Sequence, residues 1–324
     1  MRISKFIFMT IGALMLLSSC EFEFDVRSHA KPGLYVQCMA DEGSGQVFVK
    51  MQYAAPAQGN TNDIPALDIR SMKMTHRGKA LDVIDRDSVF VASCPGGISS
   101  GDEIVLSVDA AGLPEVDASC TVPGGIALKG MTHGVDTLMN VPMHTLTLEF
   151  DRQMAGDEYL AVLLQRTTYF EGDSTKVDYL TPMVNFGSNM EIETAQIGFV
   201  SPFMKESRGV ETRITVIPAA AAKGTDLILT SADFASVMPP MMTPGWMPGM
   251  PLPPAPVVVR REYHAEVWAV SESFYRYALA SYKSKSDFMA MMGLAPANFA
   301  WSNIQGGFGV CAAMVPGGET TIEE

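Results

Sequence analysis

The sequence predicts a mainly β protein made of two immunoglobulin-like β-sandwich domains, with one C-terminal helix and a final short strand. From Gly33 onward, short stretches alternate apolar and polar residues with a period of two, which is typical of strands with one buried face. Turn residues separate these stretches every ~8 to 12 positions, the spacing of an immunoglobulin-like sandwich. Pro123-Gly124-Gly125 marks a boundary. We therefore expect the first domain at 33–123 and the second at 126–324.

The expected strands share this alternation and are separated by turn residues. In the first domain they lie at 34–40, 46–53, 69–75, 80–84, 88–93, 103–109 and 115–122. In the second domain they lie at 144–150, 159–169, 175–180, 194–200, 211–217, 226–230 and 257–270. A helix is expected from about 272 to 292, because Ser271 can cap it and Phe274, Ala278 and Tyr282 recur at helical spacing.

The N-terminus has the pattern of a bacterial lipoprotein signal peptide over residues 1–19. Arg2 and Lys5 precede an uncharged run that ends at Leu17, shorter than the ~20 residues that a membrane-spanning helix needs. The run leads into Leu17-Ser18-Ser19-Cys20, a lipobox whose cysteine thiol receives a diacylglycerol before cleavage. Lipidation is therefore expected at Cys20.

Residues 20–32 are expected to form a lipidated tether. Two or more acyl chains, the palmitate and diacylglycerol of such anchors, bury enough CH₂ groups for stable attachment to outer-membrane lipid. The acidic stretch Glu21-Phe22-Glu23-Phe24-Asp25 resembles the surface-export signal of Bacteroidota lipoproteins. We expect a protein anchored in the outer membrane and exposed at the cell surface.

Charge restricts the partners. Lys and Arg total 23 and Asp and Glu total 36, which gives a formal net charge of −13. Phosphate backbones attract clustered cations, so nucleic acid is excluded as a partner.

Five cysteines fit an oxidising compartment. With Cys20 lipidated, Cys38, Cys94 and Cys120 of the first domain are disulfide candidates, while Cys311 lies far along the chain. Their connectivity stays open. No C-x-x-C motif occurs and the histidines are scattered, so we expect no metal site and no cofactor.

Two motifs that suggest chemistry stand in the wrong context. Gly97 to Gly101 fits the G-x-S-x-G pattern of hydrolases, but a strand is expected after it where the nucleophile elbow requires a helix. Gly307 to Ala312 fits G-x-G-x-x-A, yet too few residues follow for a dinucleotide-binding unit. These glycines are expected to allow close approach of a neighbouring backbone. No catalytic residue is assigned.

The segment 238–256 combines five methionines, eight prolines and one tryptophan. Proline favours extended backbone without ladder hydrogen bonds, so a projecting loop is expected. Three interpretations stay open: a flexible insertion, Cu(I) ligation by thioethers, or contact with a partner or ligand. The contact residues would be Met241, Met242, Trp246, Met247 and Met250.

The C-terminal part resembles a known family. The stretches 272–277 and Trp301-Ser302-Asn303-Ile304-Gln305-Gly306-Gly307-Phe308-Gly309-Val310 are similar to the ending of a Bacteroidota outer-membrane lipoprotein family known only as a domain of unknown function. The lipobox, the strand near 34–37 and Gly101-Asp102-Glu103-Ile104-Val105-Leu106 follow its N-terminal order. The resemblance implies a surface lipoprotein that accompanies a TonB-dependent receptor, and it carries over no catalytic residue.

The sequence thus predicts a non-catalytic surface lipoprotein that binds a ligand or serves as an accessory subunit of a TonB-dependent outer-membrane receptor. Two alternatives remain. One is a lipid-anchored extracytoplasmic hydrolase whose acids converge only in three dimensions. The other is a pilus-type structural or adhesin subunit with an unpaired strand edge.

Overall fold

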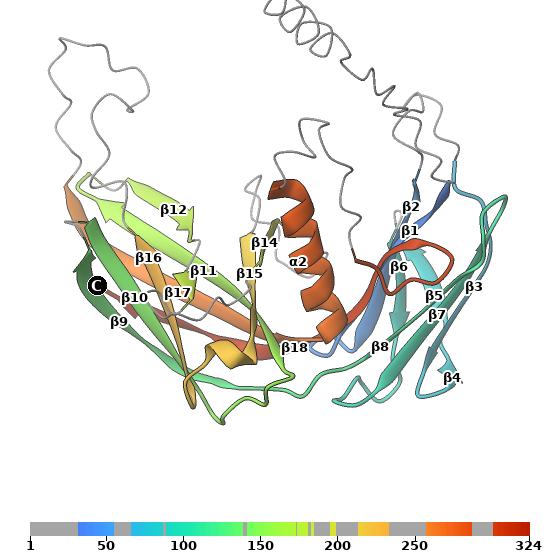
Figure 1. The fold of residues 1–324 in the computed structure, drawn as a ribbon, viewed down its shortest axis with the longest axis horizontal. Helices are drawn as coiled ribbons and strands as arrows, with labels where there is room; N and C mark the ends of the chain where they lie inside the picture. The colour runs from blue at the N-terminus through green and yellow to red at the C-terminus, as the bar shows by residue number, and fades with distance from the viewer. Residues whose placement is uncertain are drawn as a thin grey trace, which may run out of the picture. The chain divides into compact units, whose positions relative to one another are not determined.

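The computed structural model describes residues 32–54, 66–86, 89–138, 141–172, 174–180, 183–184, 195–198, 213–232, 257–286 and 301–324. These residues confirm a mainly β fold of the β-sandwich type with one α-helix (Figure 1). One compact unit contains Gly33–Ala54 and Ala66–Glu324. The other unit, Met1–Pro32 with Ala55–Pro65, falls outside the described residues except for Pro32. No described helix has the length and apolarity needed to span a bilayer.

The described elements follow one another in this order: β1 Gly33–Asp41, β2 Gln46–Ala54, β3 Ile69–His76, β4 Lys79–Ala80, β5 Val83–Arg86, β6 Val89–Ser93, β7 Glu103–Ala110, β8 Val116–Thr121, β9 Leu128–Leu138, β10 Val141–Phe150, β11 Tyr159–Phe170, β12 Thr175–Tyr179, β13 Met183–Val184, β14 Ala195–Gly198, β15 Arg213–Pro218, the 3₁₀ turn η2 Ala219–Ala221, β16 Asp226–Ala232, β17 Val258–Val270, α2 Glu272–Ser286 and β18 Phe308–Glu323. Most expected strands appear within two residues of their predicted ends. The expected strand 80–84 is divided into β4 and β5, and neither β9 nor β13 was expected.

The final strand corrects the sequence prediction. It was expected to be short, but β18 is 16 residues long. It pairs in parallel with β1 and antiparallel with β17. Its hydrogen bonds therefore join the first described strand to a strand more than two hundred positions later in the chain.

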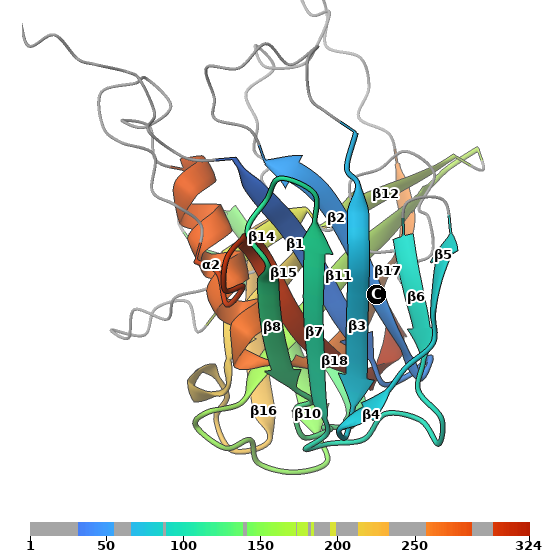
Figure 2. The same ribbon diagram turned by 90° about the vertical axis from the view of Figure 1, so that its right-hand side faces the viewer.

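The described strands form three sheets. The largest has ten strands in the order β14-β15-β11-β17-β18-β1-β2-β6-β5, with β12 beside β11. The two smaller sheets have the orders β13-β16-β10-β9 and β4-β3-β7-β8. Figure 2 shows β3, β7 and β8 side by side, as their pairing requires.

The division into domains at 33–123 and 126–324 stays a prediction. Residues from both sides of the expected boundary meet in the described structure. The strands β1 and β18, from either side of the expected boundary, are neighbours in one sheet. A single core cluster also contains Leu106 from one side and Leu148 from the other.

Successive residues of the long sheet point to opposite faces, and each face has its own core. Cys311 and Ala313 of β18 belong to the cluster that also contains residues of the two smaller sheets. Val310, Ala312 and Met314 belong to a second cluster that includes Phe274 and Ala278 of α2. The smaller sheets thus cover one face of β18, and the helix covers the other.

The helix begins as expected, directly after Ser271. The carbonyl oxygen of Ser271 accepts hydrogen bonds from the N–H groups of Phe274 and Tyr275. Its hydroxyl accepts from the N–H of Ala313 at 3.1 Å, so the side chain joins the helix start to β18. The expected residues 287–292 lie outside the described chain.

The segment before β18 joins two sheets. Gln305 and Asp117 exchange backbone hydrogen bonds of 2.8 and 3.1 Å, which attaches the segment to β8. The amide nitrogen of Asn303 donates to the carbonyl oxygens of Ser119 at 3.1 Å and Cys311 at 2.8 Å. Its amide oxygen accepts from the N–H of Cys311 at 2.9 Å. One asparagine side chain therefore connects β8 to β18.

Two glycines make this close approach possible: Gly309, for which this folding role was expected, and Gly306, for which it was not. Gly309 has φ +112° and is the register partner of Val36. A Cβ at Gly309 would overlap the Val36 carbonyl oxygen, and one at Gly306, with φ +74°, would overlap that of Glu115. Neither the backbone angle nor the space tolerates a side chain.

We expect Gly309→Ala to lower the free energy of unfolding by about 3 kcal/mol or more, because it combines an unfavourable φ with a backbone clash. Gly112→Ala is the matched control, since Gly112 has φ +75° and nothing within 4 Å of an added Cβ. That variant should lose only about 1 kcal/mol. Urea unfolding measures both, and equal losses would show that the close approach contributes nothing.

Candidate functional site

The residues named from the sequence for lipidation and contact, Cys20, Met241, Met242, Trp246, Met247 and Met250, lie outside the described residues. The strands on either side of the loop are described. β16 ends at Ala232 and β17 begins at Val258. The structure therefore shows the two strand ends between which the expected loop lies in the sequence.

Exposed apolar residues lie at the start of β17, where the described chain resumes. Val257, Val258 and Val259 have exposed fractions of 60%, 39% and 65%. Successive strand residues point to opposite faces, so both faces of this strand end are accessible. We call Val257–Val259 the valine run.

Polar and aromatic side chains lie next to the valine run. The guanidinium of Arg260 lies 4.0 Å from the centre of the Tyr169 ring, a cation–π contact. The Tyr169 hydroxyl donates to Glu262 at 2.7 Å. Arg260 also forms ion pairs with Glu262 at 2.7 Å and Glu323 at 3.3 Å. The apolar run thus has a charged border.

A second group of functional side chains lies farther along β17. Nε2 of His133 and Nδ1 of His144 are 3.0 Å apart. The Tyr263 hydroxyl lies 2.9 Å from the same His144 nitrogen and 3.1 Å from Oε2 of Glu324. The His133 ring stacks on Tyr263 with centroids 4.7 Å apart. We call His133, His144 and Glu324, with Tyr263 beside them, the histidine cluster.

The histidine cluster is half enclosed. Tyr263 and His144 are buried, whereas the Glu324 side chain is 29% exposed. Burial, followed by the nearby Glu324 carboxylate, raises the pKa of Tyr263 well above its usual range. The phenol therefore stays protonated and acts as a hydrogen-bond donor. The donor atoms of both histidines and Glu324 lie within 4.8 Å of one another, a spacing that allows them to hold a metal ion.

The sequence did not reveal this cluster, because its histidines seemed scattered. They come from neighbouring antiparallel strands: His133 of β9 pairs with Leu146 of β10, and His144 lies two residues before Leu146. The two rings therefore share one face of the hairpin as diagonal neighbours. A hairpin prediction over 128–150 would have been the signal, but the strand 128–138 was not expected.

A third group, His264, Glu266 and Glu319, also meets the spacing for a metal ion. Here both imidazole nitrogens already have partners. Nδ1 lies 3.0 Å from the Thr321 hydroxyl and Nε2 lies 3.1 Å from Glu266. Glu319 is 72% exposed, so this group is a solvated strand surface.

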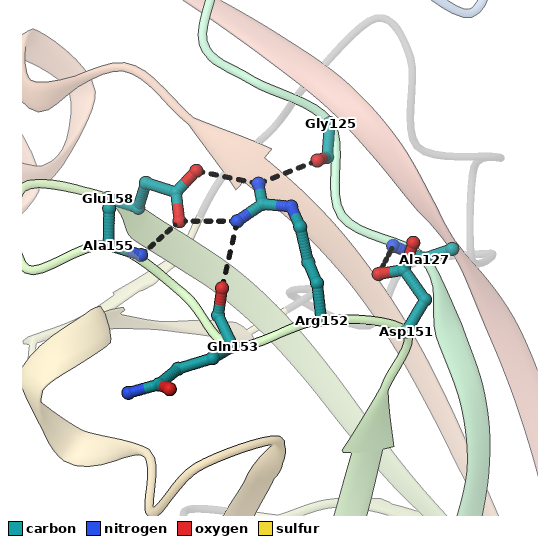
Figure 3. A network of polar contacts seen from close by, with 7 residues as sticks. All are labelled: Gly125, Ala127, Asp151, Arg152, Gln153, Ala155 and Glu158. Atoms are coloured by element: carbon teal, nitrogen blue, oxygen red, sulfur yellow. Dashed lines mark hydrogen bonds and ion pairs between the residues drawn. The ribbon is translucent and has the colours of Figure 1, made fainter.

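A polar network borders a small pocket at the start of β11. Arg152 donates to both carboxylate oxygens of Glu158 at 2.9 and 2.6 Å, and to the carbonyl oxygen of Gly125 at 2.8 Å (Figure 3). Glu158 also accepts from the N–H of Ala155 at 2.6 Å. The cavity has a volume of about 10 Å³, which is room for about one water molecule and not for an organic ligand. Arg152 and Glu158 are paired with each other and with backbone groups of the same region, so the network stabilises the turn between β10 and β11.

The G-x-S-x-G segment is a turn before strand β7, as expected. His76 and the backbone N–H of Ser99 each donate to Oδ2 of Asp102 at 2.8 Å, and Arg77 donates to Oδ1. Burial opposes ionisation of Asp102, but these hydrogen bonds outweigh it and lower its pKa to about 2. Ser99 contributes its backbone here. The arrangement holds the turn through a buried carboxylate.

The described cysteines are buried free thiols. Cys311, expected to lie apart, is the register partner of Cys38. Hydrogen bonds with Cys120 and Cys38, together with burial, raise the pKa of the Cys311 thiol well above its usual range. Burial and then the charge of Asp102 raise the pKa of the Cys94 thiol. Cys94 therefore lies near Asp102 and not with the other three thiols. Disulfide formation stays a prediction.

We expect Asp102→Asn to lower stability at pH 7 by about 2 kcal/mol, because charge-assisted hydrogen bonds are lost. The folded pKa of Asp102, about 2, lies below its ordinary 3.8. Its stabilising contribution is therefore full above the ordinary value and is lost as the pH falls towards 2. The difference in the free energy of unfolding between wild type and Asp102→Asn, measured by urea unfolding, should therefore decrease as the pH falls from 3.8 towards 2. Asp109→Asn, which removes an exposed ion pair with Arg70, should change stability little; a gap independent of pH would contradict the assignment.

We expect any disulfide formed during refolding with reduced and oxidised glutathione to join Cys311 to Cys38 or Cys120. Thiol–disulfide exchange forms the bond and releases reduced glutathione. Peptide mapping by mass spectrometry identifies the pair. Cys94→Ser should leave the map unchanged and Cys311→Ser should remove the bridge; a bridge between Cys94 and Cys120 would show that the arrangement is wrong.

No protein-family model and no curated protein matches the sequence. Among solved structures, similarity is found to a chain in "Complete structure of manganese lipoxygenase of Gaeumannomyces graminis and partial structure of zonadhesin of Komagataella pastoris". The identity is 8%, the alignment covers 74% of this chain and 89% of that chain, and the TM-score is 0.17. Such a low TM-score supports no conclusion about fold or function, so the functional argument depends on the residues themselves.

Proposed function

We propose that the protein is a non-catalytic lipoprotein of the outer-membrane surface that contacts an integral β-barrel receptor through the valine run and the loop attached to it. The observation that carries the proposal is the exposure of three successive valines at the point where the Pro/Met-rich segment joins β17. The lipobox at Cys20 and the resemblance to a receptor-associated lipoprotein family support the choice of partner.

The composition of this strand end suits a protein interface. Interfaces place apolar residues at the centre and polar residues at the rim, and they are enriched in tyrosine and arginine. The valine run supplies the apolar part, and Tyr169 and Arg260 border it. The Met and Trp residues expected in the adjoining segment are adaptable apolar groups of the same kind.

A lipid anchor makes a modest interface sufficient. An acylated Cys20 would confine the protein to the membrane that holds the receptor. Confinement raises the effective concentration of each partner for the other, so a weak contact gives substantial occupancy. The proposal therefore requires neither a deep pocket nor a large interface.

We expect Val257→Ser with Val259→Ser to reduce co-purification of a cross-linked β-barrel receptor from native membranes. Burial of each valine contributes roughly 1.5 kcal/mol, so loss of both should weaken the complex by about a hundredfold. Quantitative mass spectrometry of the captured barrel measures the effect. The thermal stability should change little, because both side chains are exposed.

Ile84→Ser is the matched control, since Ile84 of β5 is 57% exposed and lies on another strand of the long sheet. It should leave capture unchanged. Equal recovery of the barrel with all three proteins, or recovery of the lipoprotein alone from wild-type membranes, would reject the proposal.

A further inference from the structure

We propose that the histidine cluster is a binding site for a divalent transition-metal cation of the Zn²⁺ type, held by His133, His144 and Glu324. This proposal is independent of the proposed receptor contact. It depends on the geometry of four side chains from four strands or strand ends.

The fold brings the ligands together from two sheets. His133 and His144 share one face of the β9–β10 hairpin in a smaller sheet. Tyr263 belongs to β17 of the long sheet, and Glu324 follows β18 and exchanges backbone hydrogen bonds with Arg261. The site therefore lies where the hairpin faces the β17–β18 pair, and a cation there would link the two sheets.

The distances suit a tetrahedral ion. Zn–N bonds of ~2.0 to 2.1 Å place neighbouring donor atoms about 3.3 Å apart. The two histidine nitrogens are 3.0 Å apart, so a shift of a few tenths of an ångström would accommodate the ion. The Glu324 carboxylate completes a set of three donors within 4.8 Å of one another, and a partly exposed side chain can move to close that distance.

Without a metal ion, the side chains of His133, His144 and Tyr263 cannot all form full hydrogen bonds with one another. An imidazole nitrogen carries either one lone pair or one N–H. Nδ1 of His144 nevertheless has two neighbours at hydrogen-bond distance, His133 at 3.0 Å and Tyr263 at 2.9 Å. Its single lone pair or hydrogen must therefore be shared between the two.

A cation resolves this competition. His133 and His144 would each direct one lone pair at the metal. The Tyr263 hydroxyl would then donate to Oε2 of Glu324 at the observed 3.1 Å. A hydrogen bond of that kind orients a ligating carboxylate. The tyrosine is thus assigned as a positioning residue and not as a ligand.

The donor set and its surroundings restrict the ion. Two imidazoles and one carboxylate favour Zn²⁺ and related transition metals over Ca²⁺ and Mg²⁺. Arg261 opposes binding, because its guanidinium lies 3.5 Å from Oε2 of Glu324 and competes for the carboxylate. Replacement of Arg261 by a neutral residue should therefore tighten metal binding. A merely structural cluster would not show this effect.

The test is a titration of the purified, EDTA-treated protein with Zn²⁺ in competition with a chromophoric chelator. Wild type should bind one equivalent at the cluster. We expect His133→Phe, which keeps the ring stacked on Tyr263, and Glu324→Gln to weaken binding by at least about tenfold each. Arg261→Gln should strengthen it severalfold.

His264→Phe is the matched control, since it removes an imidazole from the solvated group on the same pair of strands. It should change the affinity for Zn²⁺ less than twofold. Circular dichroism confirms that each variant is folded. Absence of binding by wild type would overturn the proposal, as would binding that persists in both ligand variants or that is lost equally in His264→Phe.

Discussion

The structure depends above all on the close approach of Asn303–Val310 to two other backbones. This segment pairs with β8 through Gln305 and continues into β18, which pairs with β1. Side chains would prevent both approaches, since a Cβ at Gly306 or Gly309 would overlap a carbonyl oxygen. This contact fixes the position of β18, and that position determines which residues of other strands the side chains of β18 contact.

Two arrangements distant from that segment follow from it. Placing β18 beside β1 brings Cys311 next to Cys38 and within reach of Cys120. Pairing of β18 with β17 from Met314 to Glu323 carries Glu324 to Arg261 and Tyr263. The thiol group and the histidine cluster are therefore both consequences of where the last strand enters the sheet.

Local pattern predicted much of the fold and little of the candidate site. Strands with regular alternation, such as β7 and β8, were expected nearly at their observed ends. The strand β9 was missed because Gly130, His133 and Gly134 interrupt its apolar pattern, and β18 was underestimated because Gly317 and Gly318 do the same. The histidine cluster needs the β9–β10 register and a glutamate about 180 positions later, so no local spacing could indicate it.

The strand β17 connects the two features to which functions are assigned. Its first residues form the exposed end of the valine run, and Tyr263, five residues farther, is fully buried against the histidine cluster. A metal ion held by the β9–β10 hairpin and by Glu324 would bind both hydrogen-bond partners of Tyr263, His144 and Glu324. Such an attachment restrains the strand end from which the Pro/Met-rich segment leaves. Restraint of a contact surface before binding reduces the conformational entropy lost on binding, so the proposed metal would favour the proposed contact without touching the partner.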